Sequence, residues 1–229
     1  MRILVVRPAP AAFRTAARLA ERGHAAVVAP VLAVRPTGTP PPAGPFDALV
    51  LTSANAAEPA RDHGGGRLPV FCVGAETAAV ARTAGFADVT TAGRDATALA
   101  EFVRGRRPPP ARLLLAAGRD RKAEPERTLR SMGYETAVWP VYTAEILPAL
   151  PDAARQALAT EALDGALHYS RRSAAAFLAL AEAAGLGPAA RGLRHLCLSA
   201  DVAAGLSGCE RVAVAASPDE PALLDLVRR

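Results

Sequence analysis

The stretch DALVLTSANA at residues 47–56 reappears in outline as DGALHYSRRS at residues 164–173. Each begins with an aspartate, continues as a short apolar run and passes through hydroxyl-bearing residues into an alanine-rich segment. An apolar run of this length is typical of a strand buried on both faces, and the alanine-rich segment is typical of a helix. The chain therefore contains the same strand-to-helix step twice.

The neighbouring segments repeat as well, and their order is kept. The further matched pairs are VFCVGAETA at 70–78 with HLCLSADVA at 195–203, GRDATAL at 93–99 with SPDEPAL at 217–223, and LLLAAG at 113–118 with LVVRP at 4–8. Self-similarity of this kind indicates two copies of one βα-rich unit.

Short apolar runs predict the strands, and helical patterns lie between them. Strands are predicted at 2–6, 26–29, 47–52, 69–73, 88–91, 112–116, 136–139, 164–169, 194–198 and 211–215, and helices at 11–22, 75–84, 96–104, 125–132 and 173–184. Glycines 23, 85, 133 and 185 stand where a left-handed residue would end a helix. The alternating order predicts an α/β fold of two similar lobes, each a parallel sheet flanked by helices.

Composition limits the class of protein. The chain has 229 residues, 51% of them hydrophobic and 21% charged, which is typical of a globular protein with one large or two small domains. No apolar run reaches the ~20 residues of a membrane span, and the apolar start at residues 3–6 is too short for a secretory signal. We therefore expect a cytoplasmic protein that does not bind a membrane. The three cysteines and four histidines have no metal-ligand spacing, so no metal is expected.

Charge favours an acidic ligand. The net charge is +5, and the cations are arginines except for Lys122. Arginine suits carboxylates and phosphates. Lys122 is not part of a phosphate-binding Gly-Lys-Ser/Thr loop, and no glycine-rich dinucleotide motif follows a strand. The arginines are dispersed and stacking aromatics are few, so nucleic acid is a weaker alternative and we expect none to bind.

Candidate binding residues stand where strands pass into helices. These steps are 52–55, 74–77, 170–173 and 199–201. Helix N-termini offer free N–H groups and a partial positive charge, and the carboxyl ends of parallel strands meet at one edge of a sheet. The set therefore predicts an anion site. The alternative for each single serine is that it only caps its helix.

Taken in order, these motifs resemble the uroporphyrinogen-III synthase family. They are Arg7-Pro8 after the first strand, the 47–55 step, VGAETA at 73–78, Gly133-Tyr134 followed by Val141-Tyr142, and Ser217-Pro218 before a leucine-rich helix. The resemblance covers essentially the whole chain. It implies two α/β domains between which the chain crosses twice. Residues 1–34 and 148–229 would form one domain and 37–141 an inserted one, with connectors near 35–36 and 142–147 making a two-stranded link.

The resemblance also implies an activity. The family cyclises hydroxymethylbilane, a linear polycarboxylate tetrapyrrole, to uroporphyrinogen III in haem biosynthesis. The last pyrrole ring is inverted, and no cofactor takes part. The implied partners are this substrate and the upstream hydroxymethylbilane synthase. We expect the enzyme itself to be a monomer.

Site residues follow from the same resemblance. Tyr142 matches the family's interdomain tyrosine and would donate a proton or hydrogen bond to the departing hydroxyl; packing at a connector is the alternative. The implied substrate-binding residues are Arg7, Thr52, Ser53, Asn55, Gly74, Thr77, Ser170, Arg171, Arg172 and Ser199.

The second copy departs from the family pattern. Val202 replaces the threonine of the Gly-x-x-Thr step, and Asp201 puts a carboxylate beside an expected anion site. These departures favour the alternative of a non-catalytic relative that binds a tetrapyrrole or another anion.

Overall fold

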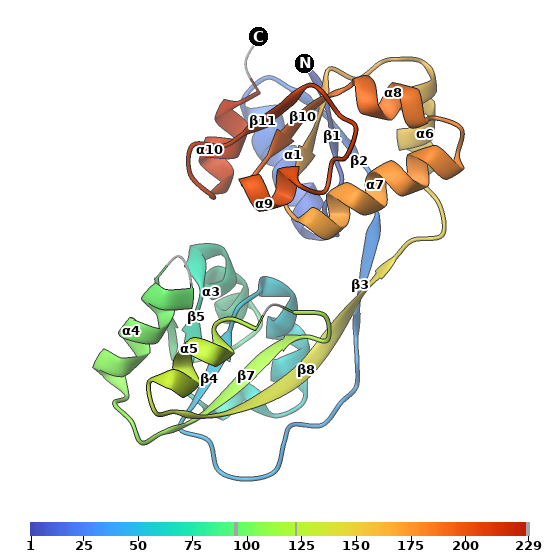
Figure 1. The fold of residues 1–229 in the computed structure, drawn as a ribbon. Coiled ribbons are helices and arrows are strands. Elements are labelled where there is room, and N and C mark those ends of the chain that lie inside the picture. The colour runs from blue at the N-terminus through green and yellow to red at the C-terminus, as the bar shows by residue number, and fades with distance from the viewer. Residues whose placement is uncertain (94–95, 122, 228–229) are drawn as a thin grey trace. The chain divides into compact units, whose positions relative to one another are not determined.

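The computed structural model describes residues 1–93, 96–121 and 123–227. The chain divides into two compact units: unit 1 comprises residues 1–33 and 145–229, and unit 2 comprises residues 34–144 (Figure 1). Arg94 and Asp95 of the third repeated segment, and Lys122, lie outside the described residues.

Unit 1 is built from both ends of the chain. Its elements are β1 (Arg2–Val5), α1 (Ala11–Glu21), β2 (Ala25–Val28), α6 (Asp152–Ala159), β9 (Gly165–His168), α7 (Arg171–Ala183), α8 (Gly187–Gly192), β10 (Arg194–Cys197), α9 (Ala200–Ala203), β11 (Val212–Val214) and α10 (Glu220–Asp225).

Unit 2 is continuous in sequence. Its elements are β4 (Ala48–Leu51), the 3₁₀ helix η1 (Ala54–Ala56), α2 (Ala57–Asp62), the 3₁₀ helix η2 (Gly65–Arg67), β5 (Val70–Cys72), α3 (Gly74–Thr83), β6 (Val89–Thr91), α4 (Ala96–Arg106), β7 (Arg112–Gly118) and α5 (Glu126–Ser131). The chain enters the unit along β3 (Leu32–Pro36) and leaves it along β8 (Glu135–Ile146), and these two strands are neighbours in the sheet.

The two sheets share one strand order. The order is β11-β10-β9-β1-β2 in unit 1 and β6-β5-β4-β7-β8 in unit 2, with β3 added beside β8. Apart from the β3–β8 pair, the neighbouring strands run parallel. Each strand of unit 1 thus occupies the position of its repeated counterpart, although β1 and β2 come first in the chain. This confirms the predicted fold class.

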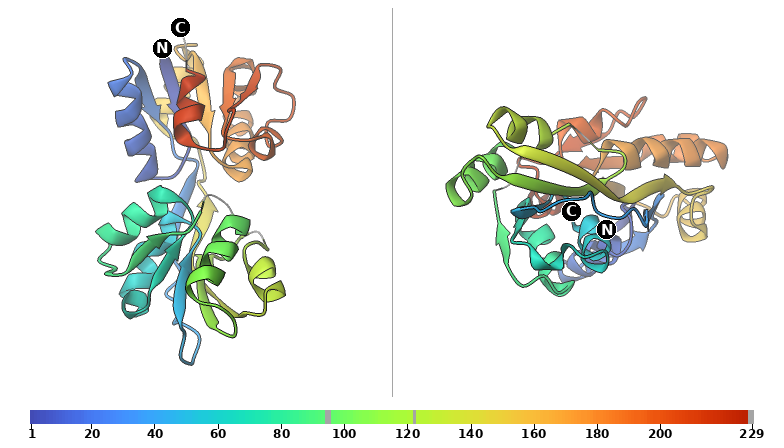
Figure 2. Two further views of the ribbon diagram at one scale, coloured as in Figure 1. Left: turned by 90° about the vertical axis from the view of Figure 1, so that its left-hand side faces the viewer. Right: turned by 90° about the horizontal axis from the view of Figure 1, so that it is seen from below.

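Helices cover both faces of each sheet (Figure 2), because successive apolar residues of the central strands point to opposite faces. In unit 2, Leu49 and Leu51 pack with α2 and α3, whereas Ala48 and Val50 pack with α4 and α5. Both sets are buried. A strand buried on both faces needs apolar residues at successive positions, which is the pattern that the sequence shows.

Unit 1 follows the same rule. One face of its sheet packs with α1 and α10 through Leu19 and Leu223, and the other packs with α7 and α9 through Ala174 and Val202. No described helix is both long and apolar enough to cross a bilayer.

Candidate functional site

The carboxyl ends of three neighbouring strands meet in unit 2. β4 pairs with β7 so that Leu51 lies beside Ala116, and β7 pairs with β8 so that Gly118 lies beside Tyr142. A pocket of about 260 Å³ opens at this edge. It is lined by Thr52, Ser53, Leu115, Ala117, Gly118, Asp120, Arg121, Glu124, Pro125, Glu126 and Tyr142. Three of the predicted site residues, Thr52, Ser53 and Tyr142, are thus brought together.

An irregularity in the β7–β8 ladder positions Tyr142. Ala117 pairs with Pro140 but Gly118 pairs with Tyr142, so Val141 is the extra residue of the bulge. Bulges re-aim side chains and are frequent beside functional sites. The Tyr142 carbonyl also accepts a hydrogen bond of 2.8 Å from the Arg119 amide, which fixes the backbone at this point.

Gly118 leaves the room that the Tyr142 ring occupies. A Cβ atom at residue 118 would lie 2.9 Å from Cζ and 3.0 Å from the hydroxyl oxygen of Tyr142. The first distance is shorter than a real Cβ contact and the second is unusually tight, so a side chain at residue 118 would displace the end of the ring. Glycine therefore lets the tyrosine hydroxyl lie over the strand that ends at the pocket.

The first turn after β4 is held by Ser53. Its hydroxyl accepts a hydrogen bond of 3.3 Å from the Asn55 amide and caps η1. Ser170 and Ser199 do the same at the start of α7 and α9, accepting from the Ser173 amide at 3.1 Å and the Val202 amide at 3.4 Å. All three serines thus cap their helices, as the alternative interpretation of the sequence expected.

The loop after β7 brings charge to the pocket. Glu126 forms ion pairs of 2.8 Å with Arg121 and Arg130. Glu124 accepts 2.7 Å from the Thr128 hydroxyl and pairs at 2.8 Å with Arg127. The Thr128 hydroxyl, followed by Arg127, lowers the Glu124 pKa.

These contacts give both carboxylates partners within the chain. Among the described lining residues, Arg121 is the cation that an acidic ligand would meet beside Tyr142. The described lining thus carries the carboxyl groups of Asp120, Glu124 and Glu126 and the guanidinium of Arg121, with the Tyr142 phenol beside them.

The other predicted residues of unit 2 do not line this pocket. Asn55 is half-buried in η1, and Thr77 is buried on α3. The Gly74 amide donates to the Gly93 carbonyl at 3.0 Å, so this N–H at the start of α3 is already used. Burial raises the pKa of the neighbouring Cys72 thiol to about 11, which makes it a poor nucleophile.

In unit 1, Arg7 has a carboxylate partner of its own chain. Its guanidinium lies 3.3 Å from Glu220 and stacks 4.0 Å from the centre of the Tyr169 ring. Glu220 also accepts 2.6 Å hydrogen bonds from Tyr169 and Thr15, and it pairs with Arg18. The Arg7 side chain remains 16% exposed.

Ser170, Arg171, Arg172 and Ser199 follow β9 and β10 in unit 1. They stand at the carboxyl edge of that sheet, as Thr52 and Ser53 do in unit 2. Both arginines are exposed in the first turn of α7.

Sequence reasoning missed Asp120, Arg121, Glu124 and Glu126. The available signal was the run 113–118, which was matched to the first strand as part of the repeat. The residues after this run follow a parallel strand and therefore reach the same sheet edge as Thr52 and Ser53. They were missed because they carry charges and not hydroxyls.

The comparisons with known proteins agree with one another. The family model described as uroporphyrinogen-III synthase HemD matches residues 14–225. A search of curated proteins finds no match. Among solved structures, uroporphyrinogen-III synthetase from Helicobacter pylori has a TM-score of 0.64 at 17% identity, covering 99% of this chain and 98% of that one. A mutant uroporphyrinogen III synthase from the extremely thermophilic bacterium Thermus thermophilus has a TM-score of 0.54 at 14% identity, covering 98% and 96%. Both likenesses concern the fold.

Proposed function

The chain belongs to the uroporphyrinogen-III synthase HemD family, and from this membership we infer which of its groups carry out the cyclisation. It is a lyase-type enzyme of tetrapyrrole and haem biosynthesis. Its substrate is hydroxymethylbilane, and its product is uroporphyrinogen III. The family match over residues 14–225 is the observation that carries this conclusion.

The reaction is a cyclising dehydration. The hydroxyl of the terminal hydroxymethyl group leaves with a proton as water, and the first ring keeps an electrophilic methylene. The last ring attacks through its substituted carbon, which gives a spiro intermediate. That intermediate fragments and recloses with the last ring inverted, so no atom beyond those of water is lost.

Most of the catalysis is conformational in this proposal. Uncatalysed closure gives the uninverted isomer, so the enzyme must favour the geometry that leads to inversion. No step needs a metal or an organic cofactor, because the leaving water needs only a proton donor and the pyrrole carbon is itself the nucleophile.

Tyr142 is the proposed proton donor to the departing hydroxyl. Its support is the pocket that its ring lines together with Thr52, Ser53 and Arg121. Because Gly118 has no Cβ atom, the ring can lie close against the backbone of β7. Arg121 would bind a substrate carboxylate close to the phenol, and Thr52 and Ser53 would add hydrogen bonds to the same ligand.

The remaining substrate carboxylates require further contacts. We assign these to the start of α7 at Ser170 in unit 1, with Arg171, Arg172 and Ser199 beside it, and to Asn55 in unit 2. Gly74 and Thr77 receive no assigned contact, because the Gly74 amide is bonded to the Gly93 carbonyl and Thr77 is buried. The first turn of α7 supports the assignment in unit 1, since this helix has enough turns to present a partial positive end and both arginines of that turn are exposed. Arg7 would contribute through the exposed part of its guanidinium.

A non-catalytic relative is the alternative function. Its sequence support was Val202, and the structure gives this residue a packing role: its side chain is 3% exposed in a cluster with Ala174, Cys197 and Leu206. A hydroxyl at this position would be buried, as that of Thr77 is. The valine therefore removes a buried hydroxyl and not an exposed ligand group.

The product isomer tests the function. Purified protein is mixed with freshly generated hydroxymethylbilane, and the oxidised porphyrins are separated by reversed-phase chromatography. We expect the type III isomer to dominate. If only the type I isomer forms at the spontaneous rate while the protein still binds the substrate, the chain is a binding relative.

We further propose that the enzyme acts as a monomer in the cytoplasm and receives its unstable substrate from hydroxymethylbilane synthase. Sedimentation velocity measures the first point. For the second, the fraction of type I isomer is compared in a coupled reaction with and without an excess of an inactive variant, which competes for transfer only if the two enzymes associate.

A further inference from the structure

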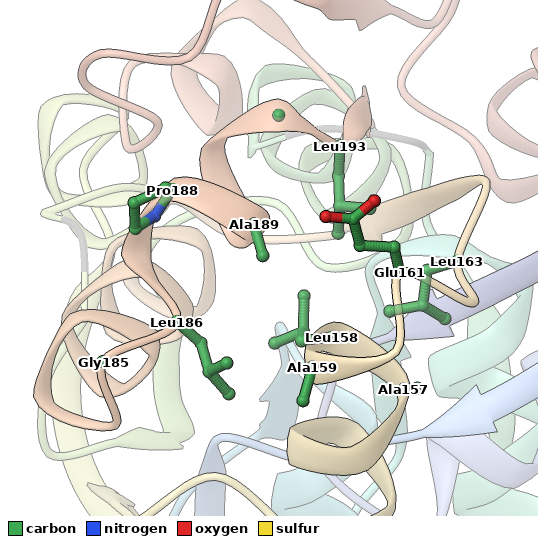
Figure 3. A pocket seen from close by; sticks show the side chains of 11 residues that line it. Ala157, Leu158, Ala159, Glu161, Leu163, Gly185, Leu186, Pro188, Ala189 and Leu193 are labelled. Carbon is green, nitrogen blue, oxygen red and sulfur yellow. The ribbon is translucent and has the colours of Figure 1, made fainter.

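Unit 1 has a pocket at the opposite edge of its sheet from Ser170 and Ser199. It lies where β9 and β10 begin, and its volume of about 620 Å³ exceeds that of the pocket beside Tyr142. Figure 3 shows its wall, formed by the end of α6, the turn between α7 and α8, and the residues before β10. Four leucines belong to its lining: Leu186 and Leu193 are half-buried, and Leu158 and Leu163 are buried.

Glu161 is the charged side chain of this lining, among the residues that the structure describes. It extends over the pocket from the turn after α6 (Figure 3). No ion pair or hydrogen bond joins its carboxylate to any side chain in the described part of the chain. The carboxylate is therefore available to a ligand.

The backbone at Glu161 is unusual. Its φ of 51° is left-handed, and Glu161 is the non-glycine residue with this conformation in the described chain. The amides of Glu161 and Ala162 donate to the carbonyls of Leu158 and Ala157 at 3.1 and 2.9 Å, which is the hydrogen-bond pattern of a Schellman helix end.

Other helices of the protein end in the same way with glycine. Gly23, Gly85, Gly133 and Gly185 have φ values of 77°, 91°, 92° and 71°. A side chain at such a position is disfavoured, and strain of this kind is concentrated at functional sites. At α6 the protein therefore keeps a carboxylate where glycine would be more stable.

Helix dipoles reinforce the negative charge. The pocket is lined by Ala157 and Ala159 from the last turn of α6 and by Gly185 just after α7. Helix C-termini carry a partial negative charge. The pocket therefore combines leucine side chains with the Glu161 carboxylate and the ends of two helices.

We propose that this pocket binds a small organic cation with an aliphatic body. An ammonium or guanidinium group pairs with the Glu161 carboxylate, and the aliphatic body packs against Leu186 and Leu193. The pocket lies at the opposite edge of the sheet from Ser170 and Ser199, so this proposal does not depend on the site of the cyclisation.

The test compares three probes of one shape on the full-length protein. Hexylammonium, hexanol and hexanoate are titrated into ¹⁵N-labelled protein, and amide shifts are followed by NMR. We expect hexylammonium to shift the amides of Leu158, Leu186 and Leu193 and to bind about fivefold tighter than hexanol, as one partly exposed charge pair allows. Hexanoate should not bind. Equal binding of all three probes, or binding of none, overturns the proposal.

Variants separate charge from folding. Glu161→Gln should reduce hexylammonium binding to the level of hexanol, and Glu161→Asp should keep the preference. Glu161→Gly should also lose the preference while the midpoint of thermal unfolding rises by about 2 °C, because glycine relieves the left-handed strain. Glu210→Gln, at an exposed glutamate of the same unit, is the matched control. A preference that survives in Glu161→Gln contradicts the proposal.

Discussion

The phenol of Tyr142 is the smallest part of the molecule on which the proposed chemistry depends. Tyr142→Phe keeps the ring that packs at Gly118 and removes only the proton donor. We expect kcat to fall by about 10²-fold, the lower end of what general acid catalysis contributes, with little change in KM. The measurement is the initial rate of type III product from hydroxymethylbilane.

The control for Tyr142 is Tyr134→Phe. The Tyr134 hydroxyl donates 2.7 Å to the Arg107 carbonyl in the same unit and does not line the pocket. Its removal should lower stability by about 1 kcal/mol and leave kcat unchanged. Equal rate losses in the two variants would show that Tyr142 is only structural.

Arg121 should act on substrate binding. Glu126 holds its guanidinium at 2.8 Å in the pocket beside Tyr142. Arg121→Gln removes one charge-assisted contact to a substrate carboxylate, so we expect KM to rise by about tenfold with a smaller effect on kcat. Steady-state kinetics checks this. Arg130→Gln removes the other partner of Glu126 without touching the pocket, so a similar KM in both variants would contradict the assignment.

At the scale of single residues, the sequence predicted some of the positions that line the pocket but not which side chains pair with one another. Thr52, Ser53 and Tyr142 were expected to be functional, and they line one pocket. The Arg7–Glu220 pair could not be foreseen, because its members are 213 positions apart and come from segments whose packing only the fold decides. Arg121 stands in a loop, where no periodicity marks a functional side chain.

At the scale of elements, the close approach of β7 and β8 sets the position of the phenol. Gly118→Ala adds a Cβ atom about 3 Å from the Tyr142 hydroxyl, so the end of the ring has to shift. We expect a loss of kcat comparable to that of Tyr142→Phe. Combining both changes should cost little more than either alone, because both act through the same hydroxyl. Fully additive losses, measured by the same kinetics, would contradict this.

The sequence predicted where strands lie better than it predicted where one strand ends. The sequence predicts one strand at 136–139 and, from the resemblance, a separate connector near 142–147. The structure joins them as β8, Glu135–Ile146. Proline is tolerated in a strand at a bulge, and Pro140 lies beside the bulge residue Val141. The bulge is a property of the pairing with β7, so a single strand does not reveal it.

For the whole molecule, the repeat was the most informative signal. Matching 2–6 with 112–116 and 47–52 with 164–169 predicts two sheets with equivalent strands, and β1-β9 and β7-β4 are indeed equivalent neighbours. The repeat was visible because buried parallel strands impose apolar runs on both copies. The sequence did not predict the charged residues that the loop after β7 brings to the pocket, because loop sequences are not constrained by packing in the sheet.

The two units should also differ in their response to acid, because unit 1 buries a histidine pair. The rings of His168 and His195 are fully buried and hydrogen-bonded at 2.9 Å, with Phe177 packed on both. Burial, and secondly the charge of His195, lowers the His168 pKa from 6.5 to about 3. Burial lowers the His195 pKa as well.

Both rings are neutral when folded, so unfolding takes up protons below pH 6.5. The free energy of unfolding therefore has its full value well above pH 6.5 and falls progressively as the pH drops toward 3. Between pH 7.5 and 5.5 the loss from His168 alone is about 1.4 kcal/mol. Trp139 is the single tryptophan of the chain and is buried in unit 2, so its fluorescence reports that unit, whereas far-UV circular dichroism reports both. In urea titrations we expect the dichroism midpoint to fall over this range, with the fluorescence midpoint nearly constant.

The control is the double variant His168→Leu/His195→Leu, which should abolish the difference between the two midpoints. Parallel shifts of both signals in the unmodified chain would mean that the histidine pair does not control the acid sensitivity of unit 1.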